Sequence, residues 1–333
     1  MVDKIRWGIM STGYIAGVFA EGLSFLPDAE LIAVGSRSAP SANHFADRHG
    51  VSHRHSSYEA LIHDPDVDVV YIGTPHPFHK EHILLSLSAG KPVLCEKPLN
   101  INAVETATVI EAARKKNLFL MEAMWSRFLP ALVKVRNLLA ESVIGEVQIL
   151  NTDFGFQADP DPAGRLYNPA LAGGALLDIG IYPVSLASMI FGPPARITSM
   201  AHIGETGVDE QAGIILGYKN GALAVSYVTI RAGSPTEATL IGIKGRIHLH
   251  AQVGLFRPYK LMLSLEGQED RVIDVPYEGN GYQYEAAEVM RCLRAGKLES
   301  DIMPLEESLS IMKTLDDIRD QWGLKYPMEQ ARL

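Results

Sequence analysis

The first 125 residues alternate short apolar runs with segments of helical periodicity, and this alternation restricts the fold more than any other feature of the chain. The apolar runs predict strands at 5–10, 31–35, 67–73, 92–95 and 119–123, and the segments between them predict helices at 14–26, 41–49, 80–89 and 103–116. The runs are nearly continuous, which is typical of parallel strands covered by helices on both faces. The sequence therefore predicts an α/β fold that begins with a Rossmann-type, doubly wound parallel sheet.

The rhythm changes after about residue 125. Helices are predicted at 130–141, 173–190, 284–295 and 305–322, and strands at 146–156, 197–202, 213–218, 223–230, 237–243, 246–250, 259–265 and 271–275. Short turns, such as Asn220–Gly221, join most of these strands and favour antiparallel pairing. We expect two domains, residues 1–124 and 125–333, the second an α+β domain with an open, mostly antiparallel sheet. Its C-terminal helix is a candidate to pack back on the first domain.

Length, charge and cysteine content exclude several classes of protein. The chain has 333 residues, enough for two cores at roughly 150 residues per domain. Its 30 basic and 39 acidic residues give a net charge of −9, so nothing favours binding to nucleic acid or to an anionic membrane. Cys95 and Cys292 form no CxxC pair, which argues against disulfides and thiolate metal sites. No apolar run reaches about 18 residues and no leader peptide is evident, so a cytoplasmic location is expected.

A candidate dinucleotide-binding turn follows the first predicted strand. The three small-residue positions of a GxGxxG or GxGxxA pattern fall at 11, 13 and 16. Ser11 replaces the first glycine, and Gly13 and Ala16 occupy the other two positions. Gly13 lets the backbone approach a phosphate, which the start of the next helix would attract. An ordinary tight turn is the alternative. The predicted cofactor-binding residues here are Ser11, Thr12, Gly13, Tyr14 and Ile15.

The end of the next strand indicates which dinucleotide would bind. NAD-specific folds place a carboxylate there, but this chain has Ser36, Arg37 and Ser38. Arg37 suits a 2′-phosphate, and the serine hydroxyls can hydrogen-bond to the same group. The segment favours NADP over NAD, unless Arg37 is simply a solvated loop charge.

Lys97 follows the predicted strand 92–95 and precedes Pro98, which favours an extended backbone at the carboxyl edge of the sheet. Ligands of open α/β sheets bind at this edge, where a lysine can bind a substrate oxygen or lower the pKa of a neighbouring acid. A surface ammonium at a strand end is the alternative.

Asp178 and Tyr182 are two polar side chains in an apolar run, four residues apart and so on one face of a helix. A buried Asp–Tyr hydrogen bond in the core and a catalytic pair are both consistent with this pattern. Oxidation of an alcohol by nicotinamide needs a base, and a phenol acts as one near neutral pH only if a cation stabilises its phenolate. Lys97 and Tyr182 would supply that pair.

Two further groups of residues are candidates. Thr74, His76 and His79 are interpreted as a loop lining the cofactor rather than as metal ligands, and no metal is expected. Trp125 and Phe154 would form an apolar wall for the C–H faces of a sugar or cyclic diol, or alternatively belong to the core between the domains.

The whole chain resembles the glucose-fructose oxidoreductase and inositol dehydrogenase family of NAD(P)-dependent enzymes. The resemblance rests on Arg6–Ile9, Glu96–Pro98, Leu118–Phe128 and Gly173–Tyr182. It implies that Lys97 and Tyr182 are the catalytic pair. Many relatives have a histidine where Tyr182 stands, and the tyrosine makes this chain similar to a branch of the family that oxidises dihydrodiols.

The same resemblance assigns further roles. It implies that Asp178 orients the substrate or the pair and that Arg37 contacts the 2′-phosphate. Ser41 replaces a second arginine of that branch, with His44 as a partial substitute, which would weaken the NADP preference. Glu96, Lys97 and Arg127 are counted among the cofactor-binding residues, and a homodimer through the open face of the second sheet is expected.

The predicted function is hydride transfer between NADP, or NAD, and a hydroxyl-bearing carbon of a small cyclic polyol, a D-xylose-like aldose or a trans-dihydrodiol. A reductase of a keto- or anhydro-sugar would use the same catalytic groups. A catalytically silent NADP-sensing protein is the alternative from another class.

Overall fold

The computed structural model of the protein describes residues 4–251 and 256–330 and contains two compact units. The first unit runs to Trp125 and also contains Glu278–Leu309, and the second contains Ser126–Tyr277 and the chain from Ser310 onward. The expected division was a single cut at 124/125. The units are instead discontinuous, because a late segment of the chain belongs to the first one.

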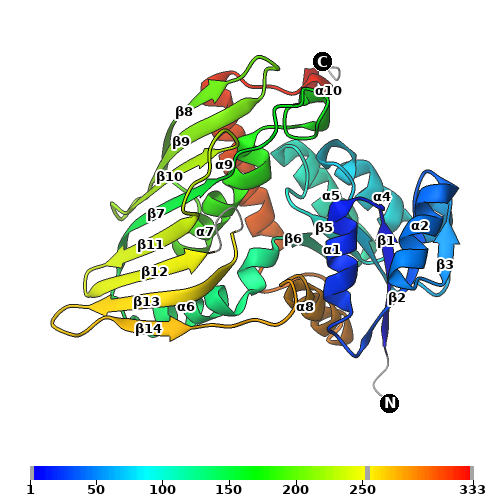
Figure 1. The fold of residues 1–333 in the computed structure, drawn as a ribbon, viewed down its shortest axis with the longest axis horizontal. Coiled ribbons are helices and arrows are strands. Elements are labelled where there is room, and N and C mark those ends of the chain that lie inside the picture. Colours follow the sequence, from blue (N-terminus) through cyan, green and yellow to red (C-terminus); the bar gives the residue numbers. More distant parts are fainter. Residues whose placement is uncertain (1–3, 252–255, 331–333) are drawn as a thin grey trace. The chain divides into compact units, whose positions relative to one another are not determined.

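The first unit is built on a six-stranded sheet with the order β3-β2-β1-β4-β5-β6 (Figure 1). Its strands are β1 (Ile5–Met10), β2 (Ala29–Gly35), β3 (His53–His55), β4 (Val69–Ile72), β5 (Val93–Glu96) and β6 (Leu120–Ala123). All neighbouring strands are parallel, which confirms the predicted doubly wound sheet. The carboxyl ends of these strands therefore share one edge, where ligands of such sheets bind.

Helices connect these parallel strands. They are α1 (Tyr14–Leu23), α2 (Ala39–His49), α3 (Tyr58–Ile62), α4 (His79–Ser88) and α5 (Ala103–Lys116). Strand β3 and helix α3 were not predicted, because they have only three and five residues and carry no clear periodicity.

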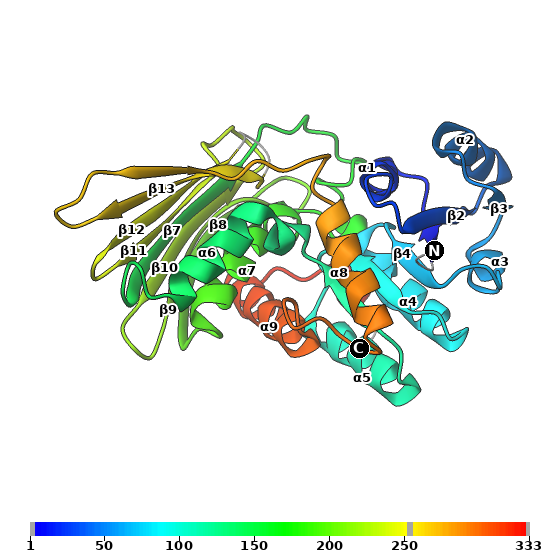
Figure 2. The same cartoon turned by 90° about the horizontal axis from the view of Figure 1, so that it is seen from below.

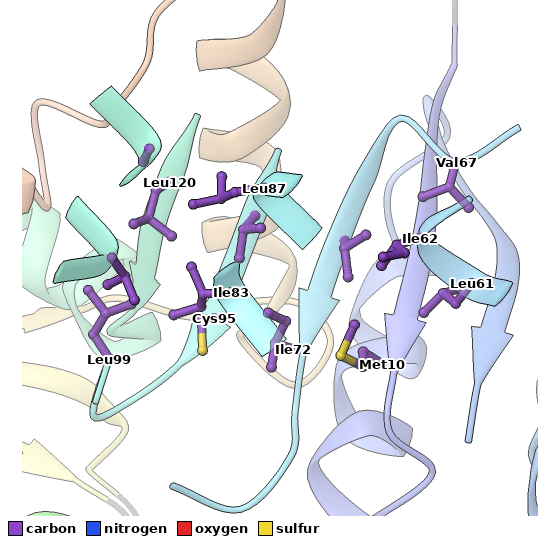
Figure 3. Close-up of a cluster of buried hydrophobic side chains, with 14 of the residues drawn as sticks. Met10, Leu61, Ile62, Val67, Ile72, Ile83, Leu87, Cys95, Leu99 and Leu120 are labelled. Atoms are coloured by element: carbon purple, nitrogen blue, oxygen red, sulfur yellow. The ribbon is translucent and has the colours of Figure 1, made fainter. Parts of the chain in front are cut away.

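A continuous apolar core fills the space between this sheet and its helices (Figure 3). Met10, Ile72 and Cys95 contribute from β1, β4 and β5, and Ile83 and Leu87 contribute from α4, all of them 0% exposed. Close packing of these side chains holds the strand ends in place.

The late segment of the first unit contains α8 (Gln283–Arg294). Just before the helix, Asn280 donates a side-chain hydrogen bond to the carbonyl of Val18 at 2.7 Å. Beyond it, the carbonyl of Leu298 accepts from the N–H of Leu120 at 3.1 Å, which extends the backbone pairing at β6. These long-range contacts explain why residues 278–309 group with the first unit.

The second unit is built on an eight-stranded sheet with the order β14-β13-β12-β11-β7-β10-β9-β8. Its strands are β7 (Val147–Gly155), β8 (Arg196–Ile203), β9 (Asp209–Gly217), β10 (Leu223–Thr229), β11 (Glu237–Gly242), β12 (Gly245–Ala251), β13 (Pro258–Leu265) and β14 (Arg271–Asp274). Strands β7 and β10 are parallel, and the other neighbours are antiparallel, which confirms the predicted mostly antiparallel sheet.

Helices lie on one face of this sheet (Figure 2). They are α6 (Pro130–Ala140), α7 (Ile181–Phe191) and the part of α9 (Leu305–Trp322) that follows Ser310, and α10 (Pro327–Gln330) ends the described chain. Gln321 of α9 accepts hydrogen bonds from the backbone N–H and hydroxyl of Ser199 in β8, both at 2.8 Å. The opposite face of the sheet carries exposed apolar side chains, such as Met200, Ile215 and Tyr227.

One helical run, Pro169–Phe191, is long and apolar enough to span a membrane by length and composition, which the sequence reading had not indicated. Its most apolar window is 78% buried inside the structure, as expected for a core helix. The run is not one regular helix as predicted: residues Leu176–Gly180 form a π-helical turn directly before α7.

Candidate active site

The turn after β1 keeps the backbone of a glycine-rich loop although its first glycine is replaced. Ser11 has a φ of +146°, a conformation that glycine adopts readily and other residues rarely do. Its N–H donates to the carbonyl of Gly35 at 3.2 Å, and its hydroxyl accepts from the N–H of Gly13 at 3.2 Å. The serine therefore holds the turn closed with its own side chain.

Helix α1 begins from this turn with an open N-terminus. Gly13 is the N-cap residue and offers no side chain to cap the first turn, and a Cβ built on it would contact only the hydroxyl of Ser11, at 3.5 Å. Tyr14 is 87% exposed at the first helical position. Uncapped N–H groups and the helix dipole make this end suitable for a phosphate. Of the five predicted residues, Thr12, Gly13 and Tyr14 line a pocket at this end of the helix, whereas Ser11 is buried and Ile15 is partly buried.

A pocket of about 400 Å³ lies beside Arg37, at the carboxyl edge of the first sheet. Tyr58 hydrogen-bonds to Arg37, although burial is the main influence on the Tyr58 hydroxyl and raises its pKa. His82 packs edge-on against Tyr58 with ring centroids 4.8 Å apart, and burial chiefly lowers its pKa to about 4. Thr74 hydrogen-bonds to His82 at 2.9 Å. The pocket combines one exposed cation and two carboxylates, those of Glu59 and Glu81, with aromatic walls.

Sequence reasoning identified Arg37 and Thr74 in this pocket and missed Tyr58. The available signal was Ser57, which caps α3 by accepting from the N–H of Ala60 at 3.1 Å and so fixes where Tyr58 begins the helix. Ser36 is buried, and its hydroxyl accepts from the N–H of Ser38 at 3.3 Å.

A second pocket, of about 550 Å³, lies between α1 and α2. Thr12, Gly13 and Tyr14 line it from α1 and its turn, and Ser41 and His44 line it from α2. Ser41 and His44 therefore line the same pocket as the turn after β1, and the substitution of His44 for the missing arginine stays a prediction. Arg48 also lines this pocket and was not foreseen.

Lys97 is partly buried at the end of β5, before a cis peptide bond to Pro98. Glu96 beside it points into the unit, where its Oε1 accepts from the hydroxyl of Tyr71 at 2.6 Å. Its Oε2 accepts from the N–H of Lys97 at 3.2 Å. Phe19 stacks on Tyr71 with ring centroids 3.7 Å apart. Glu96 is 5% exposed and therefore positions Lys97 rather than lining a cofactor surface.

His79 supports the carboxyl edge of the first sheet from inside the unit. It is fully buried, with Nδ1 at 2.9 Å from the carbonyl oxygen of Pro98 and Nε2 at 2.7 Å from that of Thr74. Burial is the main cause that lowers its pKa. The ring links the loop after β4 to the segment after Lys97, so it braces this edge and does not face the cofactor surface. His76 is also buried, with its ring 5.7 Å from that of His79.

Asp178 lies in the π-helical turn of the second unit and is 7% exposed. Its Oδ1 accepts from Nη1 of Arg165 at 2.7 Å, a partner that the sequence did not indicate. The turn is held at its start by Asp209, whose carboxylate accepts from the N–H of Leu176 at 2.6 Å. Gly174, with a φ of +119°, has no room for a Cβ because the Oδ1 of Asp209 would lie 2.1 Å away.

Tyr182 is 6% exposed and lies in α7 within a cluster of aromatic rings. Its ring centroid is 5.5 Å from that of Phe154 and 5.6 Å from that of Phe256, and the last two are 5.9 Å apart. Phe154 therefore packs against the ring of Tyr182, and its role as a wall for a substrate stays a prediction. Phe256 comes from a segment that no sequence pattern connected to the site.

Two predicted site residues have structural roles. Trp125 is 3% exposed and stacks on Tyr282, with ring centroids 4.8 Å apart, so it belongs to the core of the first unit. Arg127 is also 3% exposed, and its guanidinium donates to the hydroxyl and carbonyl of Ser185, at 2.9 and 2.7 Å. Its buried side chain supports α7 one turn after Tyr182 and leaves no surface for a cofactor.

The residues of the first unit fit a nicotinamide dinucleotide. The uncapped start of α1 suits a pyrophosphate, and the pocket beside Arg37 offers aromatic walls for an adenine and a cation for a phosphate.

Comparison with known proteins shows which family has this arrangement. Residues 5–124 match the profile of the oxidoreductase family with an NAD-binding Rossmann fold, and residues 132–248 match the GFO/IDH/MocA C-terminal domain. The chain belongs to the GFO/IDH/MocA family. This confirms the resemblance seen in the sequence, and the protein is an oxidoreductase with a nicotinamide-dinucleotide-binding domain.

Individual members of the GFO/IDH/MocA family match over nearly the whole chain. The trans-1,2-dihydrobenzene-1,2-diol dehydrogenase of Xenopus laevis is 40% identical and that of Homo sapiens 38%, over 97% and 98% of this chain and 99% of each relative. A 3-ketoreductase from Actinomadura kijaniata, solved with NADP and TDP-benzene, is 26% identical with a TM-score of 0.84, over 96% of this chain and 98% of that one. An aldose-aldose oxidoreductase from Caulobacter crescentus shares the fold, with a TM-score of 0.86 at 23% identity over 96% and 98%.

Proposed function

We propose that the protein is an NADP-dependent dehydrogenase of a hydroxyl-bearing carbon in a small cyclic substrate, a trans-dihydrodiol or a D-xylose-like sugar. The observation that carries the proposal is the phenol of Tyr182 held among the rings of Phe154 and Phe256. Aromatic walls suit the C–H faces of a ring, while the phenol offers one polar group for a hydroxyl. The names of the relatives that are about 40% identical agree with a dihydrodiol.

The catalytic roles are part of this proposal. A bound nicotinamide would supply hydride transfer. Tyr182 would take the proton from the substrate hydroxyl, or return it in the reverse direction. An ordinary phenol has a pKa of about 10, so the reaction needs a cation to stabilise the phenolate, and we assign this role to Lys97. The mechanism requires both side chains to meet at one substrate molecule. Asp178, paired with Arg165, would orient the substrate.

The preference for NADP rests on the pocket beside Arg37. Its exposed guanidinium can pair with a 2′-phosphate, and the nearby aromatic rings suit an adenine. Arg48, which also pairs with Glu21 at 3.4 Å, would add positive charge in the neighbouring pocket, and the ring of His44 would offer a hydrogen bond there, in place of the missing second arginine. We expect NAD to bind more weakly.

The test is turnover with a panel of trans-dihydrodiols, aldoses and inositols, using NADP⁺ and NAD⁺, together with keto-sugars and NADPH. Lys97→Met and Tyr182→Phe should each lower kcat by orders of magnitude and leave NADPH affinity nearly unchanged. Lys116→Met and Tyr227→Phe are matched controls away from the candidate site. Full activity in either catalytic variant would contradict the roles assigned. NADPH binding without turnover of any compound would favour the sensing protein, and turnover of keto-sugars alone would favour the reductase.

We also propose a homodimer formed through the open face of the second sheet. This face carries Met200, Ile215 and Tyr227, which are 76%, 45% and 48% exposed. Exposed apolar side chains grouped on one sheet face are typical of an interface. A cytoplasmic location is proposed as well, because Cys95 and Cys292 are both free and buried.

A further inference from the structure

Three metal-ligating side chains meet at the outer edge of the first sheet, a group that the sequence reading did not identify. Nδ1 of His53 lies 2.7 Å from Oδ2 of Asp64, and Nε2 of His55 lies 2.8 Å from the same oxygen. The two histidines are alternate residues of β3 and so share one face of the strand. Asp64 approaches that face from the turn after α3.

The backbone around these side chains is fixed independently of any ion. His53 and His55 are in register with Ala33 and Gly35 of β2, and the carbonyl of His55 accepts from the N–H of Ser36 at 3.1 Å. The carbonyl of Asp64 accepts from Nζ of Lys91 at 2.8 Å.

The carboxylate of Asp64 is buried, while the imidazoles are accessible. Asp64 is 6% exposed. The side chains of His53 and His55 are 35% and 22% exposed, so an ion can enter from their side.

We propose that His53, His55 and Asp64 bind a divalent transition-metal ion of the Zn²⁺ class. Two imidazoles and one carboxylate form a donor set that such ions prefer, whereas Mg²⁺ and Ca²⁺ prefer oxygen donors alone. Around a tetrahedral zinc with bonds of about 2 Å, each ring nitrogen would lie roughly 3.3 Å from the Asp64 oxygen, about half an ångström further than in the hydrogen-bonded pairs. Water would complete the coordination.

The site would brace the strand beside the Arg37 pocket. Ser56, Ser57 and Tyr58 follow His55 directly and line that pocket. A metal ion joining β3 to Asp64 would hold both ends of the segment 55–64 that contains these residues. Its role is structural, and the inference is independent of the substrate and the catalytic roles proposed above.

The experiment uses the full chain stripped of metal with a chelator and titrated with Zn²⁺, Co²⁺ and Mg²⁺ in a calorimeter. We expect one Zn²⁺ per chain, a rise in melting temperature with Zn²⁺ but not with Mg²⁺, and a visible absorption band with Co²⁺ that indicates nitrogen and oxygen ligands. His55→Gln and His53→Gln keep a hydrogen-bonding side chain and should each weaken Zn²⁺ binding by more than about tenfold.

Two controls separate this site from other histidines. His63→Ala removes an exposed histidine next to Asp64 and should not change Zn²⁺ affinity. His250→Ala removes a ligand from the other metal-compatible group in the described residues, in which Glu237 lies 3.4 Å from both His248 and His250. Zinc binding that His250→Ala abolishes, binding unchanged in both glutamine variants, or equal affinity for Mg²⁺ would each overturn the proposal. Far-ultraviolet circular dichroism of the metal-free variants verifies that they are folded.

Discussion

The guanidinium of Arg165 lies 2.7 Å from the carboxylate of Asp178, four residues before Tyr182. Asp178 is nearly buried, whereas the Arg165 side chain is 47% exposed, so the arginine carries the accessible part of this ion pair. Nothing in the loop sequence around Arg165 indicated this pairing.

Replacement of Arg165 by alanine should lower kcat/KM by roughly tenfold to a hundredfold, because Asp178 would lose the partner that fixes its carboxylate. Arg165→Lys should recover part of the loss. Steady-state kinetics with the best substrate of the panel would measure kcat/KM for both variants. Arg231→Ala is the control, since Arg231 forms an ion pair of similar exposure with Glu210 at 3.6 Å. Unchanged kinetics in Arg165→Ala would show that the pair has no part in catalysis.

Arg37→Ala should raise KM for NADP by at least about tenfold, or 1.4 kcal/mol, and change KM for NAD little, because only NADP has a 2′-phosphate. The measurement is initial rates with each cofactor at a saturating concentration of substrate. Arg54→Ala removes an arginine that pairs with Asp47 at 2.7 Å and serves as the control. Equal effects on both cofactors would disprove the assigned role.

Ser11→Gly should raise the free energy of unfolding by about 1 kcal/mol, because glycine adopts the φ of +146° without strain. The loss of the hydroxyl that accepts from Gly13 offsets part of this gain. Ser11→Ala keeps the strain, loses the hydrogen bond and should destabilise the fold. Ser38→Gly, at an extended backbone with a φ of −139°, should not stabilise. Urea unfolding compares the three variants with the unmodified protein. If Ser11→Gly is less stable than the unmodified protein, the backbone at Ser11 is not strained.

Stability should depend on pH through Asp209, which is completely buried and whose pKa burial raises from 3.8 to about 7. Between about pH 4 and pH 7 the folded protein keeps this proton while the unfolded chain releases it, so stability falls as the pH rises to about 7 and then stops falling once Asp209 ionises in the folded protein. Asp209→Asn carries no such charge. The free energy of unfolding of Asp209→Asn minus that of the unmodified protein should therefore increase by about 3 kcal/mol between pH 5 and pH 8.

Urea unfolding of both proteins at the two pH values measures this difference. Asp317→Asn removes an exposed carboxylate and is the control. A difference between Asp209→Asn and the unmodified protein that stays constant with pH would mean that Asp209 is ionised throughout.

A charge placed on the open face of the second sheet should dissociate the proposed dimer. Met200→Glu and Tyr227→Glu put a carboxylate among apolar side chains, which is costly in an interface and tolerated on a free surface. Sedimentation velocity measures the molecular mass. Val104→Glu is a matched control, because Val104 is 76% exposed, as is Met200, but lies on α5 of the first unit. A monomeric unmodified protein would disprove the dimer.

Local patterns were sufficient for most of the fold. The nearly continuous apolar runs predicted the parallel sheet, and short turns such as Asn220–Gly221 predicted the antiparallel one. Hydrophobic periodicity reports such features because a strand or helix buries its own residues in a regular order. β3 and α3 were missed because three and five residues are too few to show a period.

Lys97, Asp178, Tyr182 and Arg37 could be selected from the chain because each is a polar residue next to a predicted strand end or inside an apolar helix. The residues that contact these side chains could not be selected in this way. Phe256 is about a hundred residues from Phe154, and nothing near either in the chain predicts that their rings lie 5.9 Å apart. Contacts between distant parts of the chain also assign α8 to the first unit and bury Trp125 and Arg127. Such contacts come from the packing of distant elements, and the free energy of that packing depends on shape and burial, which no local pattern of residues records.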